Sequence, residues 1–575
     1  MLGEPQSDLR LQSDDCGMWG QVGCDVDCTE VLLDGASRGD QAMLDVLIRG
    51  GWIVDGTGNP SYPGDLAIEG ERIAAVGRLP GASAEKVIDA RGKLICPGLI
   101  DSHSHSDSTI LMNPEAQSTI RQGITTEIVG NCGQSPAPLS DQSRDAILRH
   151  GLLGESYAGN LRWSSFASFL EVIAQVGTSV NLGWLVGHNT LRQTVGVRGE
   201  DVTAEQLAQM QALLREAMGA GALGLSTGLE FAPGRWASAE EVVALAQVVG
   251  EFDGMYASHI RNRAKDLQPA MEEFMEIVRR SHTHGQVSHL NVRHNTGAAL
   301  DAWERAVATL EAARSEGWDV AGDCTPLLDG IGAPAAILPS WLTAGGSRRA
   351  AEMLDDRQVR ARVRTDCDRY WSFIQRGDWH RLYILGSEKH PEIVGKQFLE
   401  IAELWNKEPW DCLLDLLSAA FRQEDHVQYI ARLFTEEHVR EMVRHPLLNL
   451  AVDAATATID GPPATQFRHP LYYAGMTHYL TFWVREKHAL SLEEAIRKMT
   501  SMPATRFGLR DRGLLRRGMA ADVVVLDYDA LDEVSTVEQP LSYCRGVEHV
   551  WVNGTPVIAD GEHTGARPGS CVRCE

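Results

Sequence analysis

Eight short apolar runs recur along this chain, and most of them are followed by a stretch with helical periodicity. The runs fall at about residues 95–103, 124–131, 179–187, 222–226, 254–259, 286–290, 319–323 and 447–453. Short buried strands that alternate with helices are typical of a parallel sheet in which each strand is followed by a covering helix. Eight such units over roughly 400 residues predict an α/β fold, a (β/α)8 TIM barrel that carries insertions.

Capping boxes mark the starts of several of the expected helices. Three pairs stand just ahead of apolar-periodic runs: Thr203 with Gln206, Ser238 with Glu241, and Ser491 with Glu494. In each pair the hydroxyl can accept a hydrogen bond from a free N–H group of the first helical turn. These pairs therefore favour helices in the segments between the strands.

Both ends of the chain carry strand patterns without helices. Short alternating runs between Met43 and Lys93 predict a small antiparallel sheet, and residues 521–527 and 549–558 repeat this pattern around an Asn553-Gly554 hairpin turn. We expect the two ends to form one small β-sandwich domain. The excess length between Cys324 and Val443 predicts a small insertion before the last barrel strand. The expected parts are a mostly disordered acidic extension at 1–42, sandwich parts at 43–94 and 509–575, barrel parts at 95–327 and 443–508, and a lid-like inserted domain at 328–442.

Charge and cysteine usage exclude several classes of partner. The net charge of -25 argues against nucleic acid and against anionic membranes, because both repel an acidic surface. No run of 18 apolar residues occurs, so no transmembrane helix is expected. Eleven cysteines, an odd number without a repeating frame, fit a reduced cytoplasmic protein. The oligomeric state stays open.

The first 42 residues differ from the rest, with nine acidic and two basic residues. They lack the basic and apolar regions of a signal peptide. We expect this segment to be disordered, with Met43 as an alternative start. A small zinc knuckle on Cys16, Cys24 and Cys28 is the alternative, but no second Cys/His pair follows at suitable spacing.

Residues of the types that commonly bind metals lie at the ends of most of the expected strands. They are His103 and His105 on the first strand, Cys132 after the second, His188 after the third, and His259, His289, Asp323 and Asp453 on the fifth to eighth. Any one of them alone is more often a core or turn residue. Because active sites lie at the C-terminal face of such barrels, this repetition predicts a metal site there.

A second histidine pair, His282 and His284, provides a contrast. It follows the amphipathic pattern at 270–278, which predicts a helix. Residues two apart on a helix do not face each other, so we expect no metal at this pair.

Histidine, cysteine and aspartate are the ligands that zinc prefers. A catalytic zinc needs about three protein ligands and one open position for water. Cys132 would bind as the thiolate. Zinc lowers the pKa of its water to roughly 7, so that metal-bound hydroxide can attack a carbonyl group. A carboxylate must then accept the proton and return it to the leaving group, and Asp453 is the candidate for this catalytic role.

Motifs along the whole chain from Met43 onward resemble the metal-dependent amidohydrolase superfamily and, within it, the D-aminoacylases (N-acyl-D-amino-acid deacylases). The matching segments are Pro97–His105, Gly123–Thr126, Val129–Gly133, Gly187–Arg192, Gly224–Glu230, Tyr256–His259, Val287–His289, Lys498–Gly508, Gly518–Val524 and Asp560–Gly565. The resemblance implies a barrel, a β-sandwich made from both chain ends, and a small domain inserted before the last strand.

The resemblance also implies a ligand set. The tight zinc site of the family matches Cys132, His259 and His289. The His-x-His pair and the last-strand aspartate match His103, His105 and Asp453, which would hold a weaker second metal. In the family that aspartate is typically preceded by serine and followed by glycine. In this chain Val452 precedes Asp453 and Ala454 follows it.

Substrate recognition is where the chain departs from the family. In D-aminoacylases the substrate α-carboxylate is typically held by a lysine after the sixth strand, a tyrosine after the seventh and an arginine after the eighth. This chain has Asn291, Thr325 and Leu471 at the matching places. Because an unpaired buried carboxylate is costly, we expect an amide substrate that lacks a free α-carboxylate. His188 is expected to line the pocket with Asn291 and Thr325, or else to be structural.

Three alternatives stay open beside this small-molecule amidohydrolase. The first is an N-acyl-D-amino-acid deacylase in which Arg261, Arg293 or Arg468 takes over carboxylate binding. The second is hydrolysis of a lactone or a cyclic amide, because the zinc chemistry is the same. The third is a non-catalytic scaffold, against which the complete ligand set argues.

Overall fold

The computed structural model describes residues 43–141, 143–144, 161–197, 199–332, 337–343, 346–367, 371–425, 427–461, 464 and 467–573. The predictions for residues 1–42, including the cysteine site, lie outside these residues. No described helix is long and apolar enough to span a membrane.

Eight parallel strands form the central barrel, in sequence order around the sheet. They are β6 (Leu99–Asp101), β7 (Ile124–Val129), β8 (Asn181–Gly187), β9 (Gly224–Gly228), β10 (Met255–His259), β11 (His284–Val287), β12 (Val320–Cys324) and β16 (Leu448–Leu450). Each predicted apolar run contributes a barrel strand. The circle closes between the first and last strands, where the Asp453 N–H group donates to the His103 carbonyl and the His105 N–H group to the Ala454 carbonyl, both at 2.8 Å.

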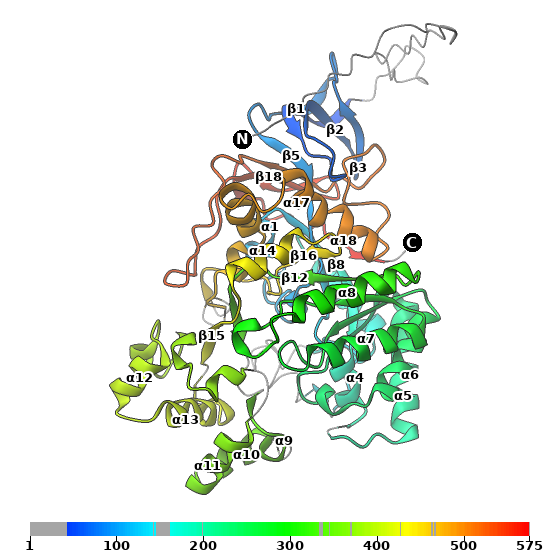
Figure 1. Ribbon diagram of the computed structural model, residues 1–575. Coiled ribbons are helices and arrows are strands. Elements are labelled where there is room, and N and C mark those ends of the chain that lie inside the picture. Colours follow the sequence, from blue (N-terminus) through cyan, green and yellow to red (C-terminus); the bar gives the residue numbers. More distant parts are fainter. Residues whose placement is uncertain are drawn as a thin grey trace, which may run out of the picture. The chain divides into compact units, whose positions relative to one another are not determined.

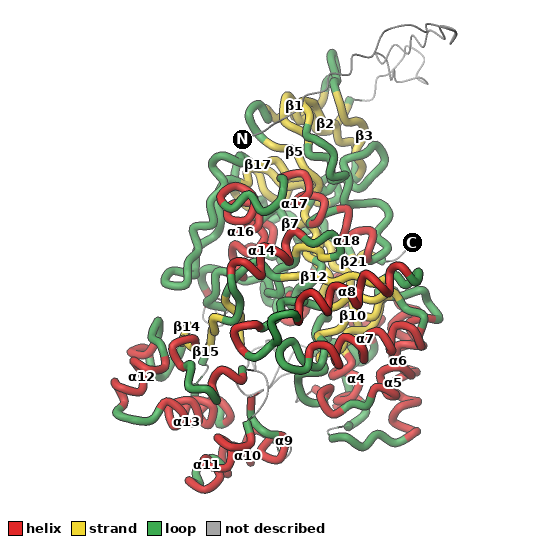
Figure 2. The backbone as a smooth tube through the Cα atoms, in the orientation of Figure 1, coloured by secondary structure: helices red, strands yellow, loops and turns green. Residues whose placement is uncertain are grey.

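Helices cover the outside of the strands, as the red elements around the yellow strands show in Figure 2. The main ones are α3 (Phe166–Val176), α4 (His188–Thr194), α5 (Ala204–Ala220), α6 (Ala239–Gly250), α7 (Leu267–Ser281), α8 (Ala302–Ser315), α16 (Leu471–His478), α17 (Leu492–Lys498) and α18 (Ser501–Arg506). The capping box of α5 is complete, with both bonds between Thr203 and Gln206. Ser238 and Ser491 cap α6 and α17, but the carboxylates of Glu241 and Glu494 bind arginines instead of returning to the cap.

The two chain ends form one sheet, in which blue N-terminal and orange to red C-terminal strands lie side by side (Figure 1). Its strands are β1 (Leu44–Ile53), β2 (Tyr62–Glu69), β3 (Arg72–Gly77), β4 (Ala84–Asp89), β5 (Leu94–Pro97), β17 (Val523–Leu526), β18 (Val547–Val552), β19 (Thr555–Ala559) and β20 (Glu562–His563). The hairpin turn at Asn553-Gly554 has positive φ at both residues, as predicted. The expectation of a purely antiparallel sheet is wrong. The chain crosses over after β3, so that β4 and β5 both run parallel to β1.

The first predicted strand, 95–103, is two strands in two different sheets. Up to Pro97 the chain pairs with β17, and from Leu99 it pairs with β7. Gly98 lies at the change, where a Cβ atom would come within 2.1 Å of the Thr125 hydroxyl oxygen. A periodicity argument cannot detect such a change because both halves are buried and apolar.

The segment between β12 and β16 forms a small three-stranded antiparallel sheet with helices. Its elements are β13 (Asp329–Gly332), β14 (Leu382–Gly386), β15 (Gln428–Arg432), α9 (Ser340–Thr343), α10 (Ser347–Met353), α11 (Arg357–Asp366), α12 (Phe398–Trp405), α13 (Pro409–Phe421) and α14 (Glu436–Arg444). The insertion therefore precedes the last barrel strand, as expected.

Candidate metal centre

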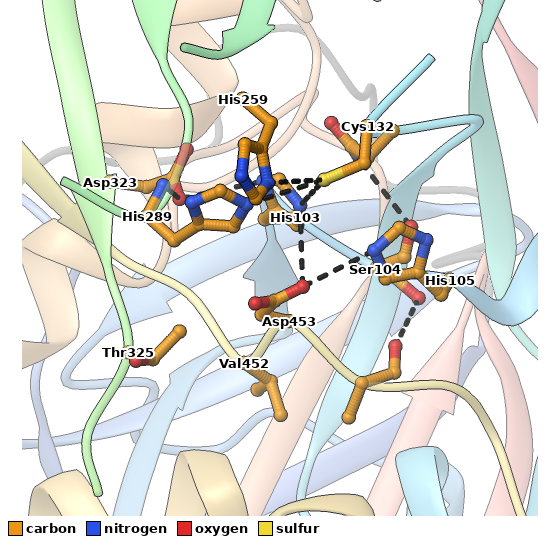
Figure 3. Close-up of polar contacts among 12 residues, drawn as sticks. His103, Ser104, His105, Cys132, His259, His289, Asp323, Thr325, Val452 and Asp453 are labelled. Atoms are coloured by element: carbon orange, nitrogen blue, oxygen red, sulfur yellow. Dashed lines mark hydrogen bonds and ion pairs between the residues drawn. The ribbon is translucent and has the colours of Figure 1, made fainter. Parts of the chain in front are cut away.

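Six predicted ligand residues lie at the carboxyl ends of five barrel strands. His103 and His105 follow β6, Cys132 follows β7, His259 ends β10, His289 follows β11 and Asp453 follows β16. In Figure 3 the side chains of these residues converge on the Cys132 sulfur and the Asp453 carboxylate. The ligand atoms of His103, Cys132, His289 and Asp453 all lie within 4.8 Å of one another.

Three imidazoles surround the Cys132 sulfur at distances that suit a shared metal. The Sγ atom is 3.4 Å from His103 Nε2, 3.6 Å from His259 Nδ1 and 3.2 Å from His289 Nε2. With bonds of about 2.3 Å to sulfur and about 2.0 Å to nitrogen, the sulfur and a nitrogen of a tetrahedral zinc site lie about 3.5 Å apart. The donor set and its spacing therefore fit zinc.

Asp453 joins the His-x-His pair to this group. Its Oδ1 atom is 3.5 Å from His103 Nε2 and 3.2 Å from His105 Nε2. The side chains of Asp453 and His105 are 29% and 26% exposed, whereas that of His103 is fully buried. Asp453 is thus the carboxylate of the centre that a substrate and water can reach.

Three of the six residues have left-handed backbone conformations. The φ angles are 52° at Cys132, 36° at His289 and 61° at Asp453. Residues with side chains adopt this region rarely, and such strain gathers at functional sites. The sharp turn just after each strand directs the side chain into the mouth of the barrel.

The local charges favour the protonation states of metal ligands. Burial opposes ionisation of Cys132, but the neighbouring imidazoles, His103 foremost, bring its pKa well below the ordinary value. Burial and the Arg263 guanidinium hold the pKa of His289 well below its usual range. A thiolate and a neutral imidazole are the forms that bind a cation.

A carboxylate and an arginine stand behind His259. Glu230 was not among the predicted site residues, and Arg293 was considered only as an alternative partner for a substrate carboxylate. Glu230 Oε2 is 2.8 Å from His259 Nε2, which leaves Nδ1 directed at Cys132. Arg293 donates to both Glu230 oxygens at 2.9 Å. Glu230 could have been found from the sequence, because it lies two residues past the fourth strand. The pattern of metal-binding residues at strand ends predicts no site residue on that strand.

The predicted substrate residues have structural partners. Fully buried His188 bonds through Nε2 to Glu241, which also pairs with Arg192. Asn291 and the Thr325 backbone exchange two hydrogen bonds, with the Asn291 amide donating at 3.2 Å and accepting at 3.0 Å. The side chains of His188 and Asn291 are thereby held in place, whereas Thr325 takes part through its backbone.

The other histidine pair lies at the opposite end of the barrel. The predicted helix forms as α7 but ends at Ser281, so His282 and His284 are not on it. His284 begins β11 and its Nδ1 is 2.8 Å from Asp319 Oδ2. The expected helical placement of this pair is therefore wrong, because the chain leaves the helix earlier than the apolar pattern suggests.

Comparison with known proteins agrees with this geometry. The Amidohydrolase family matches residues 86–369 and 409–558. The chain is 36% identical over 537 residues to an N-acyl-D-aspartate deacylase of Alcaligenes xylosoxydans xylosoxydans, covering 92% of this chain and 95% of the relative. It is 31% identical to a D-aminoacylase of the same organism, covering 93% and 98%.

Solved structures show the same likeness. A crystal structure of D-aminoacylase, 30% identical, superposes with a TM-score of 0.75 and covers 92% of this chain and 100% of the other. An N-acyl-D-glutamate deacylase from Bordetella bronchiseptica, 31% identical over the same shares, has a TM-score of 0.74. That protein was crystallised with zinc and a phosphonate inhibitor that mimics the tetrahedral intermediate.

Proposed function

Because this chain belongs to the amidohydrolase family and is a metal-dependent amidohydrolase related to the D-aminoacylases, we propose that it uses zinc to hydrolyse an amide whose α-carboxylate is absent or blocked. The observation that supports the chemistry is the Cys132 sulfur among three imidazoles, with a reachable carboxylate beside it.

Cys132, His259 and His289 would hold the tight metal, with His103, His105 and Asp453 beside it. When bound, zinc supplies Lewis acidity that activates water and polarises the substrate carbonyl. The pKa of Asp453 is lowered, because His103 and His105 together outweigh the effect of burial. Asp453 is therefore ionised at neutral pH, where it can accept the proton of the attacking water and donate it to the leaving nitrogen.

The surroundings of Asn291 support a substrate without a free α-carboxylate. The Asn291 amide is committed to the Thr325 backbone, and neither residue brings a cation to this side of the site. Leu471 is apolar and buried. Two of the arginines considered as replacements are also engaged, Arg293 with Glu230 and Arg261 with Glu273.

A second candidate is the hydrolysis of N-acyl-D-amino acids with a relocated carboxylate site. The names of the relatives favour it, and so does one cation. The Arg468 backbone N–H group donates to Gln428 at 3.1 Å, and its half-buried guanidinium pairs with no carboxylate among the residues that the structure describes. Arg468 follows the eighth strand, where the family arginine is expected.

A comparison of two substrates separates these candidates. We expect the carboxamide of an N-acyl-D-amino acid to have a higher kcat/KM than the free acid, because Asn291, Thr325 and Leu471 offer no cation at the positions where the family holds the carboxylate. If the free acid is favoured tenfold or more, about 1.4 kcal/mol, the proposal is wrong. Loss of that preference in Arg468→Ala would then identify Arg468 as the relocated partner.

The proton-transfer role of Asp453 is tested by Asp453→Asn. The variant should retain zinc after dialysis, since the thiolate and two histidines remain, and its kcat should fall about 100- to 10,000-fold. Asp266→Asn, an exposed substitution on the loop after β10, serves as the control. Full activity in Asp453→Asn would refute the assigned role.

A further inference from the structure

Asp323 is a buried carboxylate at the centre of the site, and it is not one of the six candidate ligands. It is in β12, the seventh barrel strand, and its side chain is fully buried. Its position behind His289 and His103 is visible in Figure 3. A charge in this position needs partners, because an unpaired buried carboxylate is costly.

One partner is the backbone of His289. The Asp323 Oδ1 atom accepts the His289 N–H group at 2.6 Å, and the Asp323 carbonyl accepts the Leu290 N–H group at 2.7 Å. His289 has a φ of 36°, a conformation that is unfavourable for a residue with a side chain. These two bonds join the end of β11 to β12 at the point where the chain must turn sharply to direct His289 toward Cys132.

The other partner is the imidazole of His103. Its Nδ1 atom is 3.5 Å from Asp323 Oδ1, while its Nε2 atom faces Cys132 Sγ at 3.4 Å. A carboxylate beside Nδ1 favours the tautomer with the proton there, which leaves the Nε2 lone pair for a metal. The second oxygen of Asp323 is fixed by Gln286 Nε2 at 2.9 Å.

We infer that Asp323 is a positioning residue that sets two metal ligands at once, the ring of His103 through its charge and the backbone of His289 through a hydrogen bond. This inference rests on the proposed metal site. One carboxylate would then couple the His-x-His half of the centre to the cysteine half, because the His103 ring and the His289 backbone contact the same oxygen atom.

The experiment measures metal binding by the full-length chain after removal of metal with a chelator. The probes are Zn2+, in competition with a chromophoric chelator, and Co2+, whose d–d bands report on the geometry of the ligands. Asp323→Asn keeps an oxygen for the His289 N–H group but loses the charge beside His103. We expect the second zinc ion, which His103 would help to hold, to bind about 10- to 100-fold more weakly, and the cobalt bands to change.

Asp319→Asn is the matched control, because Asp319 immediately precedes the same strand. Its carboxylate binds His284 and Arg314 at the other end of the barrel. We expect this variant to lower the melting temperature of the metal-free protein and to leave zinc binding and the cobalt bands unchanged. A general loss of stability would thus be separated from a loss of ligand positioning.

Gln286→Met provides a second test that does not depend on the folding of Asp323→Asn. It frees the far oxygen of Asp323 and keeps the charge, so we expect zinc binding to weaken by a smaller factor than in Asp323→Asn. Wild-type zinc affinity in both variants would overturn the inference while the metal site stands. Failure of the wild-type chain itself to bind zinc would overturn the proposed function together with the inference.

Discussion

Single residues decide which metal this centre would take. Thiolate is a soft ligand that selects zinc over magnesium or calcium, and Cys132 is the sulfur ligand among the clustered residues that the structure describes. Imidazole and carboxylate alone would accept a wider range of cations. The identity of the metal therefore depends more on Cys132 than on any of the histidines.

Cys132→Ser tests this dependence. A hydroxyl does not ionise at neutral pH, so we expect the variant to lose its tightly held zinc on dialysis and to lose turnover. His103→Ala should mainly weaken a second metal or the positioning of the substrate. Zinc content measured by atomic absorption reports the result. Cys324→Ser is the control: this buried cysteine bonds to the Asn449 carbonyl, and the variant should keep its zinc. Retention of zinc in Cys132→Ser would contradict the assignment of Cys132 as a ligand.

At the scale of elements, a buried lysine fixes the helix that leads into the last barrel strand. Lys498, at the end of α17, donates to the carbonyls of Val443 and His445 at 2.6 and 2.7 Å. These carbonyls lie at the C-terminus of α14, where helices leave acceptors unpaired and favour positive charge. The next element is β16, which Asp453 follows. Lys498 thus holds the end of the insertion in register with the site.

Lys498→Met should lower the free energy of unfolding by about 1 to 3 kcal/mol at pH 7, because two buried carbonyls lose their donor. Burial lowers the pKa of Lys498 to about 8, below its value of about 10.4 in an unfolded chain. The wild type should therefore gain stability as the pH rises from 8 toward 10, whereas the variant lacks this gain. Urea unfolding at several pH values checks the prediction, and a stability difference that does not widen with pH would disprove it.

At the scale of the whole chain from Leu44 onward, one barrel residue ties the terminal sheet and the C-terminal tail to the barrel. Asn181, the first residue of β8, donates to Asp522 at 3.1 Å and accepts from Asn553 at 2.8 Å and from the Ser570 N–H group at 3.0 Å. The tail then pairs with β8 through β21 (Cys571–Val572). Barrel and terminal sheet are thus joined by a buried polar network as well as by chain connectivity.

Asn181→Leu should lower the free energy of unfolding by about 2 to 4 kcal/mol, because it leaves several buried polar groups unpaired. Barrel and terminal sheet should still unfold in one transition, since β5 and β6 are separated by Gly98 alone. Denaturant unfolding followed by both fluorescence and circular dichroism measures this. Asn59→Ala, at an exposed asparagine, is the control and should change stability by less than about 0.5 kcal/mol. Equal stabilities of the two variants would refute the network's role.

The sequence by itself determined the eight barrel strands, the sheet shared by both ends and the place of the insertion. Each of these follows from local patterns: apolar runs of strand length, caps such as Thr203, and turn residues such as Asn553-Gly554. The six candidate ligands were also visible, because parallel strands of a barrel bring their carboxyl ends to one face. Local pattern and general topology were enough for this much.

Only the tertiary structure decided how those residues act together. It shows the left-handed backbone at Cys132, His289 and Asp453, which no residue pattern records. It also places Glu230 behind His259 and brings Asp323 against both His103 and His289, although these residues belong to different strands or strand ends. The same holds for the closed pair of Asn291 and Thr325. Hydrogen bonds and ion pairs depend on direction and on distances of a few tenths of an ångström, whereas periodicity records only which side of an element is buried.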